Sequence, residues 1–228
     1  MLAARIDRLS IEEKELLQTL AVLGREFPLA LVKRVTLKPD DDLERMLSRL
    51  QAGELIYEQL APSDMEYTFK HAVTQEVAYN GLLVERRKLL HERAGQALES
   101  MFAEQLNDHV DELAHHYSLS GNDAKAVEYL VRAGDQAHQL STFAEAAGYF
   151  EAALKRLKEL PLDAERDRWE IAICAGLADV TIVTSGYAAA EYERHLTRRY
   201  EIAERLGDAT QLFFSLVECQ CWLPFGWS

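Results

Sequence analysis

The side chain best placed for chemistry is His71, which lies where a predicted strand meets a predicted helix. Residues 66–70 alternate apolar and polar side chains, as a half-buried strand does, and Val73, Val77 and Ala78 then fall on one side of a helical pattern. Histidine is the side chain whose charge changes most readily near neutral pH. His71 is therefore our candidate functional residue. A structural role is also open, in which the imidazole caps the following helix or hydrogen-bonds a nearby carbonyl.

Other histidines lie close to carboxylates on one predicted helix, a combination that could bind a metal ion. Helical zinc sites place two histidines four residues apart and add a third ligand. This stretch lacks that spacing, so we interpret the group as a solvated polar face: His109, His115 and His116 with Asp108, Asp111 and Glu112. Cys219 and Cys221 have no second pair near them, and we expect two half-buried cysteines there. The sequence predicts no metal site.

Motifs of the common nucleotide-binding and hydrolytic enzymes are absent from the sequence. It contains no G-x-x-x-x-G-K-[ST] loop to hold phosphates, no G-x-S-x-G elbow and no G-x-G-x-x-G fingerprint. We therefore predict that this chain is not an enzyme, has no catalytic residue and holds no cofactor of its own.

Basic side chains at two places could contact nucleic acid. Arg45 and Arg49 lie on the exposed face of a predicted helix over residues 43–52. Glu44 lies on the same face, and this mixed charge makes the helix a weak candidate for binding DNA. A second basic cluster comprises Arg86, Arg87, Lys88 and Arg93. Neighbouring glutamates balance that cluster, as on an ordinary exposed helix surface.

Before His71, the sequence predicts three helices and a β-hairpin. Ser10 and Glu13 form a capping box that starts the first helix, and Gly24 ends it. Further helices are predicted over residues 28–35 and 43–52, and strands over 55–60 and 66–70, with Pro62, Ser63 and Asp64 in the turn between the strands. This is the plan of a winged helix-turn-helix domain, in which the hairpin is the wing and the third helix would read DNA.

After His71, the pattern is helical and the turns are short. Helices are predicted over residues 73–83, 85–103, 106–118, 124–138, 142–159, 164–183 and 188–206. Two frames match the small and apolar positions of a tetratricopeptide repeat: Val110-x2-Leu113-Ala114-x2-Tyr117 with Ala126-x3-Leu130, and Leu130-x2-Ala133-Gly134-x2-Ala137 with Ala146-x3-Phe150. Small residues are expected there because the helix backbones approach closely. Because the frames overlap, antiparallel helical hairpins are better founded than any repeat register.

Charge and apolar content narrow the classes of partner. The chain has 25 Lys and Arg against 38 Asp and Glu, a net charge of -13, and residues 105–228 carry 11 basic and 20 acidic side chains, a net of -9. Such charge repels a phosphate backbone, so nucleic acid is a disfavoured partner. No apolar run approaches the roughly 20 residues that span a bilayer. Three cysteines and a charged N-terminal stretch argue for a cytoplasmic protein without a disulfide framework or secretory signal.

Several segments together resemble one family. They are Ala3-Ala-Arg-Ile-Asp-Arg-Leu-Ser10, Gly24-Arg-Glu-Phe27, Tyr67-Thr-Phe-Lys-His-Ala72, Glu76-Val-Ala-Tyr79, Glu112-Leu-Ala-His-His-Tyr117 and Gly186-Tyr187. The family comprises bacterial multidomain predicted ATPases of the STAND class, many of which carry an N-terminal class III adenylate or guanylate cyclase domain. Their order is cyclase, AAA-type ATPase, winged helix and tetratricopeptide-like repeats, and this chain resembles only the last two.

The resemblance implies a role for His71 and a set of partners. In STAND ATPases, a histidine at the end of the winged helix can contact the β-phosphate of ADP, within a Met-His-Asp signature. Lys70-His71-Ala72 matches the histidine and departs at both flanks. ATP or ADP would bind to a domain expected before Met1. The final residues, 222–228, are expected to belong to a further, incomplete helix.

We thus expect a mainly α chain, with a winged-helix domain over residues 1–100 and an incomplete, tetratricopeptide-like right-handed superhelix over 101–228. The predicted function is a non-catalytic regulatory and protein-interaction segment of a signalling ATPase, whose helical groove binds a partner protein or the ATPase domain. The alternative is a winged-helix transcriptional regulator that binds DNA through Arg45 and Arg49. A third possibility is that cyclase or ATPase activity belongs only to a longer protein.

Overall fold

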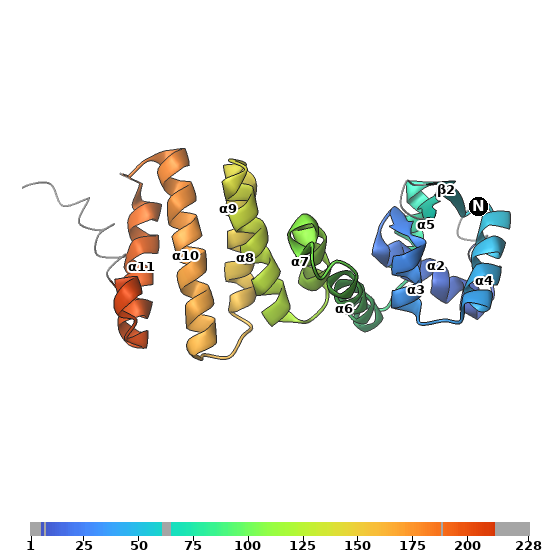
Figure 1. The fold of residues 1–228 in the computed structure, drawn as a ribbon, viewed down its shortest axis with the longest axis horizontal. Helices are drawn as coiled ribbons and strands as arrows, with labels where there is room; N and C mark the ends of the chain where they lie inside the picture. Colours follow the sequence, from blue (N-terminus) through green and yellow to red (C-terminus); the bar gives the residue numbers. More distant parts are fainter. Residues whose placement is uncertain (1–5, 7, 61–64, 188, 213–228) are drawn as a thin grey trace, which may run out of the picture. The chain divides into compact units, whose positions relative to one another are not determined.

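The computed structural model describes residues 6, 8–60, 65–187 and 189–212. Most of them are helical, and a small three-stranded antiparallel sheet accompanies the helices (Figure 1), which confirms the prediction of a mainly α chain. The contacts divide the chain into unit 1, residues 1–109 with 119–121, and unit 2, residues 110–118 with 122–228. None of the helices that the structure describes is both long and apolar enough to cross a membrane.

Unit 1 begins with three helices whose ends follow from local sequence. The elements are α2 (Ile11–Leu23), α3 (Leu29–Thr36) and α4 (Asp40–Ala52). At the start of α2, the Glu13 amide donates to Ser10 Oγ (3.3 Å) and the Ser10 amide donates to Glu13 Oε2 (2.9 Å), so the predicted capping box is confirmed. Pro28 was expected inside the second helix but is the extended residue that precedes it.

The sheet of unit 1 contains one strand that the sequence pattern missed. The strands are β1 (Glu26–Pro28), β2 (Ile56–Leu60) and β3 (Met65–Phe69), in the order β1-β3-β2 with both pairings antiparallel. Phe27 of β1 is buried, and its ring meets Phe69 edge-on at 5.8 Å between centroids. The strands of the sheet pack against α2, α3 and α4. The predicted turn at Pro62, Ser63 and Asp64 lies outside the described residues.

Two further helices complete unit 1: α5 (Ala72–Asn80) and α6 (Val84–Met101). The predicted buried face of α5 is wrong in part, because Val73 and Val77 are exposed (57 % and 36 %) while Thr74 and Ala78 are buried against α2. The buried face is therefore rotated by about one residue from the expected one. The expected continuous helix from residue 106 starts instead as a short 3-10 turn, η1 (Leu106–His109).

Unit 2 is a row of antiparallel helical hairpins (Figure 1). Its helices are α7 (Val110–Leu119), α8 (Asp123–Gln139), α9 (Phe143–Leu157), α10 (Ala164–Ser185) and α11 (Ala190–Leu206). Each of α8 to α10 packs against the next helix along the chain. The predicted apolar stripe of α7 is confirmed, since Val110, Leu113, Ala114 and Tyr117 are all buried.

Phe150 is the central side chain of this row. It is fully buried on α9, and Gly134 of α8 and Gly176 of α10 lie against its ring. A Cβ atom at Gly134 would come within 2.7 Å of the ring, and one at Gly176 closer still. The glycine in the repeat frame is therefore required by an aromatic side chain, and not by the close backbone approach that the pattern suggested.

Ion pairs tie α11 to α10. Arg198 Nε lies 2.7 Å from Glu170 Oε1, and the Arg205 guanidinium forms two hydrogen bonds to the Asp167 carboxylate. The side chains of Glu170 and Asp167 are only 8 % and 13 % exposed, so these pairs are partly shielded from water.

Candidate functional site

A groove on unit 2 runs between α7 and α9. Its wider part has a volume of about 500 Å³, and a second hollow of about 330 Å³ shares Ser118, Leu130 and Ala152 with it. We call the two together the α7–α9 groove. The polar and glycine residues that line it are Asp111, His115, Ser118, Glu145, Gly148, Tyr149, Lys155, Arg156 and Glu159.

Two hydrogen bonds cross the groove and fix the direction of its walls. The Tyr149 hydroxyl donates to Asp111 Oδ1 (3.0 Å), and Arg156 Nη2 donates to the Ser118 carbonyl (2.6 Å). Both bonds link residues 38 apart, and they are seven residues, or roughly 10 Å, apart along each helix. The walls therefore run parallel, as alternate helices of a repeated hairpin would.

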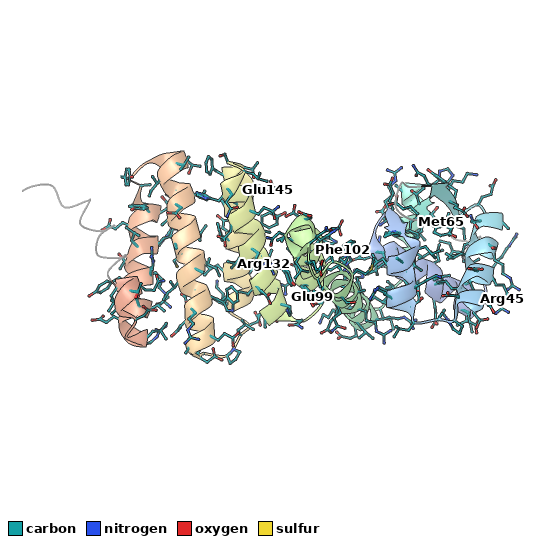
Figure 2. All side chains as sticks on the ribbon, in the orientation of Figure 1. Arg45, Met65, Glu99, Phe102, Arg132 and Glu145 are labelled. Atoms are coloured by element: carbon teal, nitrogen blue, oxygen red, sulfur yellow. The ribbon has the colours of Figure 1, made fainter. Side chains whose placement is uncertain are left out.

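One end of the groove is acidic. Glu145 lies one turn before Tyr149 on α9 (labelled in Figure 2), is exposed, and forms no ion pair with another described residue. Asp111 accepts one bond from Tyr149 and retains a second carboxylate oxygen as an acceptor. Burial, the bond to Asp111 and the nearby carboxylates raise the pKa of Tyr149 to about 12. Its hydroxyl therefore remains a donor at neutral pH.

The other end of the groove carries little free charge. Arg156 binds Asp123 Oδ1 (3.2 Å) as well as the Ser118 carbonyl. Lys155 is exposed and has no ion pair among the described residues, but Glu159 follows it by one turn and lines the same end. The two ends therefore differ in charge, with the net negative charge at the end that holds Asp111 and Glu145.

Two small residues lie between the ends. Gly148 faces open space, because a Cβ atom there would meet nothing within 4 Å. Ser118 lines both hollows, and its Oγ is buried without a hydrogen-bond partner among the described residues. Buried hydroxyls are usually satisfied, so Ser118 is an exception, although its Oγ has almost no surface exposed to the groove.

His71 lies in unit 1, at the joint where the sequence placed it. It is the extended residue that precedes α5, and its carbonyl accepts from the Thr74 amide (2.9 Å). The imidazole is exposed and makes no capping hydrogen bond, so the structural interpretation of the side chain as a helix cap is wrong. The side chain remains available for a ligand at the start of α5.

Arg45 and Arg49 lie on the exposed face of α4, as predicted (Arg45 is labelled in Figure 2), but neither is a free cation. Arg45 pairs with Asp42 (2.8 Å), and Arg49 pairs with Glu13 (2.9 Å). Three aspartates also occupy the first turn of α4. With Glu44, this helix carries four acidic residues against two arginines, and it therefore presents net negative charge to any partner.

The remaining histidines depart from the expected solvated face. His116 is buried, and His109 stacks on Phe102 with 3.6 Å between ring centroids. His115 is exposed and lines the α7–α9 groove. Among the described residues, no group of three or more His, Cys, Asp or Glu side chains could hold a metal ion. Cys219 and Cys221 lie outside the described residues.

The groove residues are the functional candidates that sequence reasoning missed. The sequence pattern of the helix that holds Glu145, Gly148 and Tyr149 indicates only its buried stripe, and Asp111 is predicted to lie on a solvated polar face. The signal that could have found them is the offset of 38 residues, which places polar positions of two helices side by side. That offset differs from the roughly 34 residues of a tetratricopeptide unit.

Comparison with curated proteins gives one relative. The chain is 24 % identical, over 230 residues, to an uncharacterized protein of Rhizobium meliloti (strain 1021). The match covers all of this chain and 21 % of the relative, so the chain spans about a fifth of the length of the curated protein it matches. No family model and no solved structure matches.

Proposed function

We propose that this chain is a non-catalytic regulatory and protein-interaction segment of a larger signalling ATPase. Unit 1 is a winged-helix-like domain that relays the nucleotide state of a neighbouring ATPase domain through His71. Unit 2 is a tetratricopeptide-like array that binds a protein partner. The observation that carries the proposal is the α7–α9 groove, with parallel walls joined by hydrogen bonds and unpaired charge on its surface.

The architecture of each unit supports these assignments. Unit 1 combines three helices with an antiparallel sheet whose β2–β3 hairpin takes the place of a wing. Unit 2 repeats helical hairpins and leaves a groove between alternate helices, which is how such arrays present binding surfaces. The relative in R. meliloti carries the counterpart of this chain within a protein roughly five times as long, which suits a segment of a multidomain protein.

Substitution at Gly148 tests the interaction role. A leucine side chain at this position would occupy the groove without displacing a neighbour, whereas alanine would barely enter it. We expect the wild type and Gly148→Ala to retain the same partner protein from a cell extract, identified by mass spectrometry, and Gly148→Leu to lose it. Equal retention by all three proteins would overturn the proposed role of the groove.

The alternative is a DNA-binding regulator, and the charge on α4 argues against it. Both candidate arginines are paired with carboxylates, and the first turn of the helix is acidic. Since phosphate contacts make affinity fall steeply with salt, a duplex-DNA titration at low and moderate salt separates the two functions. We expect negligible binding at both salt concentrations. Tight binding with a steep salt dependence would favour the DNA-binding regulator.

A further inference from the structure

The charge distribution of the α7–α9 groove indicates what kind of segment it takes. Asp111 and Glu145 line one end, and the residues that line the same hollow include no lysine or arginine. The helix N-termini on which these carboxylates stand contribute only about half a positive charge each. Residues 105–228 as a whole also carry a net charge of -9. The acidic end therefore attracts a cation.

The opposite end does not provide an equivalent anion site. Arg156 is already held by Asp123 and by the Ser118 carbonyl, which uses its guanidinium within the protein. Lys155 is left as the available cation, and the carboxylate of Glu159 lies one turn away. An acidic ligand would meet one lysine next to a glutamate, which is a weak match.

The space between the ends suits an extended backbone. Positions 145 to 157 span about 18 Å along α9, and about five extended residues cover that length. Gly148 leaves room for the main chain to approach.

From these observations we infer that the groove binds an extended protein segment through a lysine or arginine side chain. The cation of that side chain forms ion pairs with Asp111 and Glu145. This inference rests on the proposed interaction role of unit 2. The Tyr149 hydroxyl, by donating to Asp111 Oδ1, orients that carboxylate toward the cation. Glu145, which has no described ion-pair partner, provides the second carboxylate without breaking an existing contact.

Three peptide libraries test the inference with the whole chain. Each library contains seven-residue peptides with randomised flanks and one fixed central residue, which is arginine, glutamine or glutamate. Binding is measured by fluorescence anisotropy for the wild type, Glu145→Gln, Gly148→Leu and the control Gly148→Ala. We expect the best arginine peptides to bind the wild type about tenfold tighter than their glutamine counterparts, a difference of roughly one 1.4 kcal/mol step.

The variants separate the failure of this inference from the failure of the proposed function. Glu145→Gln should remove most of the preference for arginine, Gly148→Leu should abolish binding, and Gly148→Ala should change neither. If glutamine or glutamate peptides bind as tightly as arginine peptides and Gly148→Leu still abolishes binding, the inferred preference for a cation is wrong. The proposed role of the groove as a protein-binding site is then retained. If no library binds, or if Gly148→Leu has no effect, both the inference and the interaction role of the groove fail.

Discussion

Glu13 is the residue at which two contacts of unit 1 meet. It accepts the Ser10 amide at the start of α2 and the Arg49 guanidinium from α4, each at 2.9 Å. These hydrogen bonds, led by that of Arg49, hold the pKa of Glu13 below its ordinary value. A carboxyl whose pKa is lowered by folding stabilises the fold above its ordinary pKa and loses that contribution as the pH falls through the lowered value.

We therefore expect Glu13→Gln to lower the free energy of unfolding by about 1 kcal/mol at pH 7. The gap between wild type and variant should narrow as the pH falls below about 4, because the wild-type carboxyl then becomes protonated. Urea unfolding at pH 7, 5 and 3 measures this gap. The exposed neighbour Glu12→Gln is the control, and an unchanged gap across the pH series would contradict the assignment.

Three glycines of unit 2 differ in what a larger side chain would contact at their positions. Gly134 and Gly176 lie against the Phe150 ring, whereas Gly148 faces the groove. We expect Gly134→Ala and Gly176→Ala to destabilise the protein by about 1–3 kcal/mol through overpacking. Gly148→Ala should stabilise it by up to about 1 kcal/mol, because alanine is the better helix former. Thermal unfolding of the three variants measures the contrast; equal shifts would show that Phe150 does not wedge between α8 and α10.

At the scale of elements, α10 and α11 are joined by charges shielded from water. Glu170→Ala would leave Arg198 and Arg166 without their shared carboxylate, and we expect a loss of about 1–3 kcal/mol in unfolding free energy. Glu191→Ala is the matched control, since its pair with Arg194 is exposed on both sides and is worth at most about 0.5 kcal/mol. Urea midpoints compare the two, and equal losses would contradict the shielded network.

The elements themselves were largely predictable from sequence. Helix α4 was found because Leu43, Met46, Leu47 and Leu50 form one apolar face, and the structure buries all four. Strand β1 was missed because three residues carry no periodicity and their partner, β3, is some 40 positions away. The error on α5 has a similar cause, since α2 decides which of its faces is buried.

The groove could not be predicted from the sequence, because tertiary packing also decides its geometry. Its walls come from helices whose register is set by tertiary packing around Phe150, and the repeat pattern allowed two overlapping frames. Only contacts such as Tyr149 with Asp111 reveal the offset of 38 residues. His71, by contrast, could be placed from sequence, because the joint of strand and helix is a local feature.

At the scale of the whole molecule, each unit carries its own core and its own candidate site. Unit 1 presents an exposed imidazole at the start of α5, and unit 2 presents a groove with an acidic end. We propose, as the central claim, that this chain transmits the state of a nucleotide bound by a neighbouring domain.

The direct measurement is the ADP content of the longer ATPase to which we propose this chain belongs, determined by chromatography after purification. We predict that His71→Ala lowers the retained ADP about tenfold, since a hydrogen bond to a charged group is worth roughly 1.5–3 kcal/mol. Asn80→Ala, at the opposite end of α5, should retain as much ADP as the wild type. Equal ADP content in the wild type and His71→Ala would contradict the account.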